Sequence, residues 1–349
     1  MSKFRVGIIG CGKPFRSEGA TGFGMSHAHA RGYNASPDCQ IVALADISEE
    51  NARAFQAVNG GDRIYTDYHT MLADEALDIV SISTWPHLHA EMVVACAEAG
   101  VKAVHCEKPM APTYGEARRM VEVCEANGVQ LTFNHQRRFG PPYRKARELL
   151  KSGAIGDLVR LEATCDNLFD WGTHWFDMLC FYNHETDVEW VMGQIDGRGS
   201  RRIFGALVEG QGLSQFKFKN GVTGLLVTGN DVEPRLGNRL IGADGVIEVG
   251  HSQEMPLRMW GKGQSGWTPV PVESGMHGME YVEQGVLDLV DALKTGREPE
   301  LSGRRALRAT ELIFATYESS RRRGRVDLPL EIEDSPLVSM VESGELRTE

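Results

Sequence analysis

The stretch VGIIGCGKPFRSEGATGFGMSHAHARGY, residues 6–33, begins as a short apolar strand and runs into a glycine turn. A dinucleotide-binding loop follows the pattern G-x-G-x-x-G and leads directly into a helix. Here Gly10 and Gly12 follow the strand, but a phenylalanine stands where the third glycine is expected, and a second pair, Gly22 and Gly24, comes later. The stretch therefore predicts either one phosphate-binding turn with an insertion or two unrelated turns.

Short apolar runs continue as far as residue 135 and alternate with amphipathic segments. The runs are VGII (6–9), QIVALAD (40–46), DIVSIST (78–84), KAVHCEKP (102–109) and QLTFNH (130–135). This alternation is typical of βαβ units, and strands that are apolar throughout imply helices on both faces of a parallel sheet. We therefore predict a Rossmann domain, a doubly wound parallel sheet that binds NAD, over residues 1–134.

The pattern changes after residue 155 to longer alternating strands. Asn220-Gly221 and Asp244-Gly245 separate such strands and predict tight hairpins. Apolar residues at helical spacing predict two helices, at 277–295 and 303–323, and the tail from Glu333 is polar and acidic with no clear packing face. Residues 135–349 are thus expected to form an α+β domain, with a large open, mainly antiparallel sheet, that binds substrate and mediates oligomerisation.

Composition narrows the class of protein. The chain has 349 residues and a formal net charge of −11, which opposes binding to nucleic acid or anionic membranes. The N-terminus lacks the apolar region of a secretory signal, and no apolar run is long enough to span a bilayer. The seven cysteines are odd in number and contain no C-x-x-C, which favours reduced thiols in a cytoplasmic protein.

The position of a glycine motif matters more than its letters. GKGQSG, residues 261–266, satisfies G-x-G-x-x-G but lies between predicted antiparallel strands, whereas Gly10 and Gly12 follow the first strand of a βαβ series. Asp46 ends the second strand, where a carboxylate can bind both ribose hydroxyls of NAD and would repel the 2′-phosphate of NADP. The alternative is that Asp46 caps the helix that starts near Ser48.

Two further motifs carry groups suited to proton transfer. Lys108, in the sequence EKP, follows the fourth strand at the carboxyl edge of the sheet, although a surface lysine is the alternative. In DWGTHWFD, residues 170–177, Asp170 and His174 stand four residues apart, so an imidazole and an orienting carboxylate would share a helix face. A helix cap at Asp170 and a buried structural His174 are the alternative. The pairs at residues 27 and 29 and at 87 and 89 lack a third ligand nearby, so no metal is predicted.

The ordered set of motifs resembles the glucose–fructose oxidoreductase and inositol dehydrogenase family (Gfo/Idh/MocA). The set comprises the glycine turn, Asp46, STWPHLHAE (83–91), EKP (107–109), RRFGPPYRKARELLKSGAIG (137–156), Asp170 with His174, and VDLPL (326–330). The resemblance covers nearly the whole chain.

The resemblance implies roles for individual residues. Lys108, with a cis bond to Pro109, would contact the substrate and the nicotinamide, while His174 would act as the general base or acid and Asp170 as its partner. The cofactor-side positions would be Gly10, Gly12, Asp46, Thr84, His89, Glu107, Lys108 and Arg138. Arg138 would also approach the substrate, as would Trp171 and Asn167, although ordinary core packing is an equal interpretation of the tryptophan.

The chain departs from the family pattern in two regions. An insertion from about residue 13 to residue 26 separates the glycine turn from the first helix, which is expected to start after it. Its Phe15, Arg16, Phe23 and His27 are candidates for covering the cofactor or the substrate. The sequence CDNLF, at 165–169, replaces a glycine-rich run, so the substrate pocket is expected to differ in shape.

These observations predict an NAD-dependent oxidoreductase acting on a secondary alcohol of a sugar, an inositol-like polyol or a glycoside. Two alternatives remain open. One is an enzyme that oxidises its substrate transiently to permit elimination or glycoside cleavage, and the other is a non-catalytic NAD-binding regulator on the same fold. The open sheet predicts a homodimer or homotetramer.

Overall fold

The computed structural model describes residues 3–20, 22–229, 237–252 and 254–349. Two compact units divide the chain, and each is discontinuous in sequence. The first unit contains residues 1–111, 116–136 and 279–306, and the second contains residues 112–115, 137–278 and 307–349.

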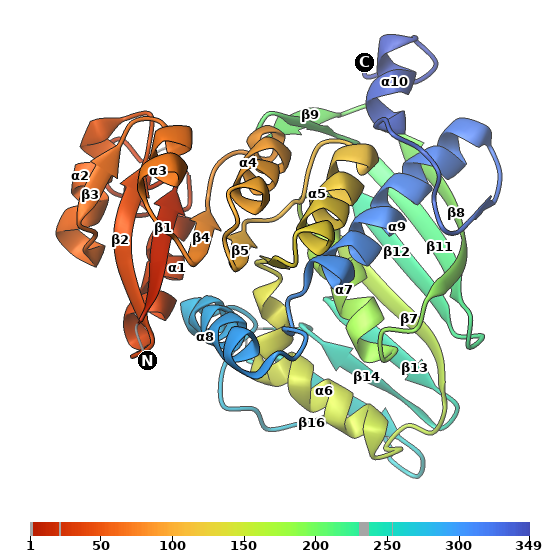
Figure 1. Ribbon diagram of the computed structural model, residues 1–349. Coiled ribbons are helices and arrows are strands. Elements are labelled where there is room, and N and C mark those ends of the chain that lie inside the picture. Colours follow the sequence, from red (N-terminus) through yellow and green to blue (C-terminus); the bar gives the residue numbers. More distant parts are fainter. Residues whose placement is uncertain (1–2, 21, 230–236, 253) are drawn as a thin grey trace. The chain divides into compact units, whose positions relative to one another are not determined.

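The first unit is built on a six-stranded parallel sheet with the strand order β3-β2-β1-β4-β5-β6. The strands are β1 (Phe4–Ile9), β2 (Cys39–Ala45), β3 (Arg63–Tyr65), β4 (Ile79–Ile82), β5 (Ala103–Cys106) and β6 (Gln130–Phe133), and Figure 1 shows β2, β1 and β4 adjacent. The helices are α1 (Met25–Ala35), α2 (Glu49–Asn59), α3 (Tyr68–Asp74), α4 (Pro86–Glu98), most of α5 (Tyr114–Ala126), and α8 (Met279–Thr295). This strand order defines the Rossmann fold that the sequence predicts. The short edge strand β3 is absent from the five strands predicted from the sequence.

Helix α8 belongs to the first unit, whereas the sequence division placed it in the second domain. It packs against α1, where a Cβ on Gly32 would lie only 2.6 Å from the Cβ of Val286. The side chains of Val286, Leu289 and Val290 are buried in the same core as the strands of the parallel sheet. The apolar face of α8 predicts a helix, but its partner is 250 residues away in sequence, so the boundary at 134 does not describe this unit.

The second unit contains a nine-stranded sheet with the order β16-β15-β14-β13-β7-β12-β11-β8-β17. Its strands are β7 (Leu158–Cys165), β8 (Val188–Asp196), β11 (Gln211–Phe218), β12 (Thr223–Gly229), β13 (Asn238–Gly242), β14 (Gly245–Val249), β15 (Leu257–Gly261), β16 (Thr268–Pro269) and β17 (Val326–Asp327). Only β7 and β12 pair in parallel, and a separate hairpin joins β9 (Arg201–Ile203) to β10 (Ala206–Val208). The prediction of a mainly antiparallel sheet is confirmed, as are both hairpins, because β11 pairs antiparallel with β12 and β13 pairs antiparallel with β14.

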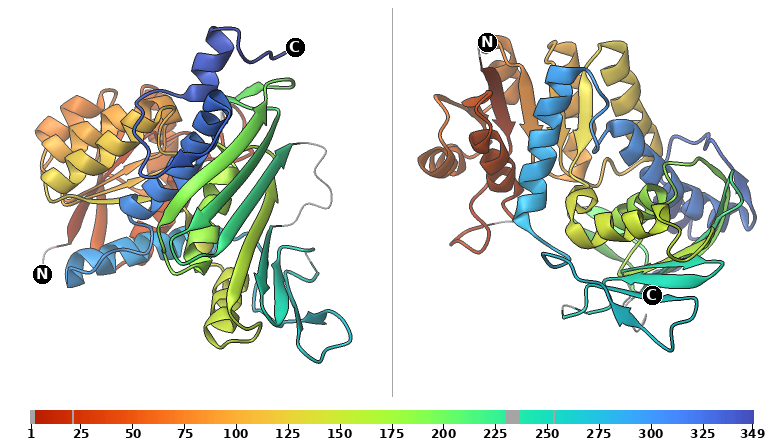
Figure 2. Two further views of the ribbon diagram at one scale, coloured as in Figure 1. Left: turned by 90° about the vertical axis from the view of Figure 1, so that its right-hand side faces the viewer. Right: turned by 90° about the horizontal axis from the view of Figure 1, so that it is seen from below.

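Helices cover one face of this sheet. They are α6 (Pro141–Lys151), α7 (Gly172–Tyr182) and α9 (Gly303–Arg322), and Figure 2 shows α9 along the broad sheet. Ser319 and Ser320 of α9 accept hydrogen bonds from the backbone of β8, at Gly193 and Ile195. Strand β11 alternates exposed and buried residues, so its other face remains open.

The tail also forms a helix, α10 (Pro336–Glu342). Leu337 and Met340 of this helix are buried against the core of the second unit, so the expectation that the tail has no packing face is wrong. The apolar residues are only three positions apart in an acidic segment, and this short pattern is too weak to indicate a helix from sequence alone.

Candidate functional site

The glycine turn lies at the carboxyl end of β1. Gly10 has a φ of 82°, and a Cβ there would lie 2.7 Å from Thr84 Cγ2, so only glycine fits between this turn and the end of β4. Gly12 has a φ of 58° and no atom within 4 Å of an added Cβ. Helix α1 begins at Met25, beyond the insertion, with no side-chain cap. Ser26 donates a hydrogen bond to the Cys11 carbonyl, so the first turn of α1 lies next to the glycine turn. The stretch therefore forms one site with an insertion.

The insertion itself has a small aromatic cluster. The rings of Phe15 and Phe23 lie 5.3 Å apart, both are exposed, and the Arg16 guanidinium stands 5.0 Å from the Phe15 ring. His27 turns away from this cluster: it stacks on Phe55 at 4.8 Å, and its Nδ1 lies 2.8 Å from the amide nitrogen of Asn59. Burial lowers the pKa of His27, and a hydrogen bond with the Gly12 backbone opposes this shift. His27 thus contacts both α2 and the glycine turn, and its role in covering a ligand stays a prediction.

Asp46 follows β2 and bonds to the glycine turn. Its Oδ2 accepts from the backbone N–H of Gly12 at 3.0 Å, and its Oδ1 accepts from the N–H of Ser48 at 2.9 Å. The cap of α2 is Ser48, which accepts from the N–H of Asn51. The alternative interpretation of Asp46 as the helix cap is therefore wrong. A carboxylate beside open space at Gly12, with an uncapped helix start nearby, fits the ribose and pyrophosphate of a dinucleotide.

Glu107 is the centre of a buried hydrogen-bond network after β5. Its Oε1 accepts from Asn134 Nδ2 at 2.7 Å and lies 2.8 Å from His29 Nε2, while its Oε2 accepts from the N–H of Lys108 at 3.3 Å. Burial alone would raise the pKa of Glu107, but hydrogen bonds and charge from His29, with help from Asn134 and Lys108, lower it on balance. The network holds the Glu107 carboxylate ionised and fixes the backbone that carries Lys108.

The two ring nitrogens of His89 each lie close to a backbone carbonyl, and a neutral ring donates to one of them. Its Nδ1 lies 2.9 Å from the Pro109 oxygen and its Nε2 lies 3.2 Å from the Thr84 oxygen. Burial lowers the pKa of His89 despite these carbonyls. The Thr84 hydroxyl donates to Met92 Sδ at 3.3 Å. His89 thus connects the loops after β4 and β5, and the bond between Lys108 and Pro109 is cis, as the resemblance implies.

In the second unit, the DWGTHWFD segment differs from its prediction in one respect. Asp170 lies in a turn before α7, where its backbone N–H donates to Asn167 Oδ1 at 2.7 Å, so it precedes the helix that carries His174, and its partnership with His174 stays a prediction. Trp171 is the N-cap residue, so Asp170 does not cap the helix. His174 lies buried in the first turn of α7, and Asp177 turns instead toward an arginine.

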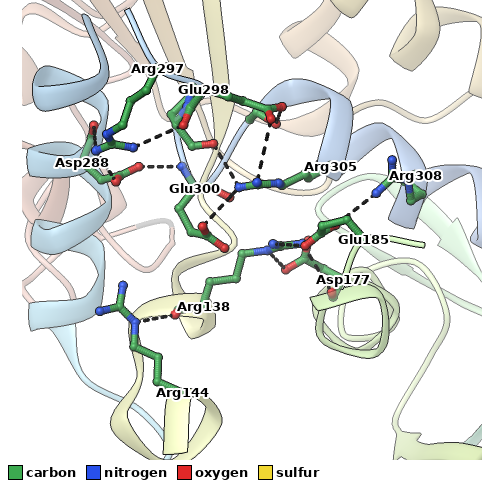
Figure 3. A network of polar contacts seen from close by, with 12 residues as sticks. Arg138, Arg144, Asp177, Glu185, Asp288, Arg297, Glu298, Glu300, Arg305 and Arg308 are labelled. Atoms are coloured by element: carbon green, nitrogen blue, oxygen red, sulfur yellow. Dashed lines mark hydrogen bonds and ion pairs between the residues drawn. The ribbon is translucent and has the colours of Figure 1, made fainter. Parts of the chain in front are cut away.

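That arginine is Arg138, whose side chain is fully buried in a charged cluster (Figure 3). Its Nε and Nη2 donate to the two carboxylate oxygens of Asp177 at 2.8 and 2.7 Å, and its Nη1 donates to Glu185 at 2.6 Å. Charge and hydrogen bonds from these two carboxylates raise the pKa of Arg138 although burial opposes them. With its fork already bound to protein carboxylates, Arg138 does not suit the predicted contact with nicotinamide and substrate.

The neighbouring Arg137 is buried against aromatic rings and makes no ion pair within the described residues. The guanidinium lies 4.1 Å from the ring centre of Trp175 and 5.1 Å from that of Trp171. Its Nε and Nη1 are buried and have no hydrogen-bond partner within the described residues. Sequence reasoning chose the second arginine of RRF and missed the first, because only the structure shows which side chain faces the tryptophans.

The side chain of Asn167 is also engaged in local hydrogen bonds. Its side chain is fully buried and donates to Asp166 Oδ2 at 2.9 Å, while its Oδ1 accepts from Asp170. The next residue, Leu168, donates its N–H to the buried Glu209. These bonds shape the CDNLF segment, so we do not retain Asn167 as a substrate ligand. Glu209 was missed because nothing in its sequence surroundings indicates burial.

The described residues have two further general features. They contain no group of three or more His, Cys, Asp or Glu side chains placed to hold a metal ion. Each helix among them is too short or too polar to cross a membrane.

The strand order, the glycine turn and Asp46 define a dinucleotide-binding fold. Residues 4–135 match the family described as "Oxidoreductase family, NAD-binding Rossmann fold", GFO_IDH_MocA. Residues 4–135 therefore carry the NAD-binding Rossmann fold of the Gfo/Idh/MocA oxidoreductases, as the resemblance of the sequence predicts.

Similarity to individual proteins extends over both units. The chain is 26% identical to D-apiose dehydrogenase of Paraburkholderia graminis, an alignment that covers 99% of this chain and 96% of that protein. It is 30% identical to myo-inositol 2-dehydrogenase of Thermotoga maritima over 44% of this chain and 42% of that protein. A levoglucosan dehydrogenase in complex with NADH has the same fold, with a TM-score of 0.80 and 21% identity over 95% of this chain and all of that one.

Proposed function

We propose that the protein is an NAD-dependent dehydrogenase that oxidises a secondary alcohol of a sugar, an inositol-like polyol or a glycoside, or reduces the matching ketone. The observation that carries this proposal is the buried Glu107 network, which fixes the backbone of Lys108 at the carboxyl edge of a dinucleotide-binding sheet. The names of the relatives, which are dehydrogenases of sugars and cyclitols, support the substrate class.

The resemblance to the family gives each group a role in the proposed reaction. Gly10, Gly12 and Asp46 would hold the NAD, which would supply the hydride acceptor. The half-buried Lys108 would donate a hydrogen bond to the substrate oxygen, and His174 would take the hydroxyl proton during oxidation and return it during reduction. Asp170 would be the polar partner that orients His174 and stabilises its cationic form. Trp171, whose side chain is 40% exposed, would supply an apolar wall for a sugar ring.

Substitution of the proposed proton-transfer pair tests the reaction. Lys108→Ala and His174→Ala are each expected to lower kcat by about 10²- to 10⁴-fold, measured as NADH formation over a screen of cyclitols, aldoses and glycosides. Lys102→Ala and His69→Ala, which remove an exposed lysine and an exposed histidine, are the matched controls and should retain activity. If both site variants turned over every accepted substrate at the rate of the native protein, the proposal would be wrong.

The same assay separates the proposal from its two rivals. Net NADH accumulation during turnover favours a dehydrogenase, whereas substrate cleavage without net NADH favours transient oxidation. NAD binding without any turnover favours a regulator. Asp46→Ala is expected to weaken NAD binding by about 10-fold or more, since it removes a charged hydrogen-bond acceptor. It should also lower the ratio of the affinity for NAD to the affinity for NADP.

The open face of the large sheet is the proposed site of self-association. Exposed apolar residues lie on several of its strands, namely Val159, Met192, Leu213 and Trp260. We expect a homodimer or homotetramer, and Leu213→Glu should lower the mass measured by light scattering.

All seven cysteines are free and buried, which agrees with a reducing, cytoplasmic location.

A further inference from the structure

Arg137 is a buried cation without an acidic partner. Only 4% of its side chain is exposed, two of its guanidinium nitrogens have no hydrogen-bond partner, and it makes no ion pair with any described carboxylate. Burial lowers the pKa of Arg137, opposed by the nearby Tyr143, Cys165 and Asp170. Because an unpaired buried guanidinium is costly, a retained one points to a partner that arrives with a ligand.

The surroundings fix how this guanidinium is presented. The guanidinium carbon lies over the rings of Trp175 and Trp171, at 4.1 and 5.1 Å from their centres, as in a cation–π contact. Trp175 is buried, whereas Trp171 is 40% exposed and so reaches solvent. The ring of His277 meets Trp171 edge to face at 6.3 Å. Partial burial and then the charge of Arg137 lower the pKa of His277, which therefore stays neutral near pH 7 and does not add positive charge.

We propose that Arg137 recognises a carboxylate on the substrate, so that the enzyme acts on an anionic carbohydrate such as a uronic or aldonic acid. This inference rests on the proposed function and names its substrate class. A carboxylate matches the planar fork of arginine, in which Nη2 acts together with either Nη1 or Nε, so it would satisfy one of the two unpartnered nitrogens. The exposed tryptophan offers a surface for the sugar ring. Arg138 cannot serve in its place because Asp177 and Glu185 already bind its fork.

Matched pairs of acid and neutral sugars test the inference. The probes are D-glucuronate against D-glucose, D-galacturonate against D-galactose, and D-gluconate against D-glucitol, assayed by NADH formation. We expect kcat/KM for at least one acid to exceed that for its neutral partner by about 10- to 100-fold, the contribution of a charge-assisted bidentate pair. Arg137→Met should abolish this preference through a higher KM for the acid, and Arg137→Lys should restore part of it because it keeps the charge but loses the fork.

Arg198→Met is the matched control. It removes one positive charge from the same unit at an exposed position paired with Asp196, so it should leave the ratio of acid to neutral turnover unchanged. Equal or greater turnover of the neutral sugars by the native protein would overturn the inference. So would an acid preference that survives in Arg137→Met, or a variant whose defect is confined to the KM for NAD.

A binding measurement separates this inference from the proposed reaction. Quenching of tryptophan fluorescence by the same acids and neutral sugars reports binding next to Trp171 and Trp175 without turnover. Acid binding that depends on Arg137, in a protein that oxidises none of the sugars, would support Arg137 as the anion site and reject the dehydrogenase. Absence of acid binding in the native protein would count against Arg137 whatever the activity with neutral sugars.

Discussion

Two adjacent arginines of the second unit, Arg137 and Arg138, are both buried, but among the described residues only the charge of Arg138 is paired with carboxylates. Arg138 is bound by Asp177 and Glu185 on all sides of its fork, whereas Arg137 rests on two tryptophan rings with nitrogens that lack partners. The first arrangement is complete within the protein and is expected to stabilise the fold. The second becomes complete when a ligand supplies an anion. Burial alone therefore does not distinguish a structural residue from a binding one, but the number of satisfied polar atoms does.

The largest expected effect comes from breaking the complete cluster. Arg138→Met leaves the buried carboxylate of Asp177 without its cation, while Glu185 keeps Arg308, and it should lower the free energy of unfolding by about 3–5 kcal/mol. Arg137→Met is the matched comparison and should change it by less than about 1 kcal/mol, since removal of an unpaired charge offsets the lost contact with the tryptophans. Urea unfolding of both variants measures the difference. Equal destabilisation would mean that Arg137 is also structural.

The Glu107 network of the first unit extends the comparison, because it too is satisfied internally. Glu107→Gln should lower the free energy of unfolding at pH 7 by about 1.5–3 kcal/mol, the range for hydrogen bonds to a charged group. The pKa of Glu107 is lowered in the folded state, so its ionised form contributes stability above the ordinary value of 4.5, and that contribution is lost as the pH falls through the folded value.

The measurement is the difference in unfolding free energy between native protein and Glu107→Gln across pH. It should be constant near neutrality and shrink below about pH 4.5. A difference that grew as the pH fell would show that the carboxylate is not the stabilising form.

The smallest of these effects concerns how closely the first unit packs around its glycine turn. Gly10 and Gly60 have nearly the same φ, 82° and 83°, but a Cβ on Gly10 meets Thr84 and Ser83 while one on Gly60 meets nothing within 4 Å. Gly60→Ala should cost about 1 kcal/mol for the backbone alone, and Gly10→Ala should cost about 1–2 kcal/mol more. Thermal unfolding compares the two, and equal losses would show that the turn at Gly10 has room to relax.

The motifs of the first unit were predictable because they are local. A strand, a glycine turn and an aspartate at the next strand end occur in a fixed order along the chain, and parallel strands bring their carboxyl ends to one edge. The sequence therefore indicated Gly10, Asp46 and Lys108, the cis bond before Pro109, and a helix that starts only after the insertion. It did not indicate that His29 and Asn134 bind Glu107, because these bonds join residues 78 and 27 positions apart.

The sequence by itself determined the fold class, the family and the elements that carry the cofactor-side residues, since apolar periodicity and turn residues act over a few positions. Only the tertiary structure decided that α8 joins the first unit, that Asp170 lies outside its helix, and that Arg137 rather than Arg138 faces the tryptophans. In the 3₁₀ turn at 136–139 both arginines are buried, and their sequence surroundings are the same. Their difference arises from partners on α7 and at Glu185, which come near only when the chain packs.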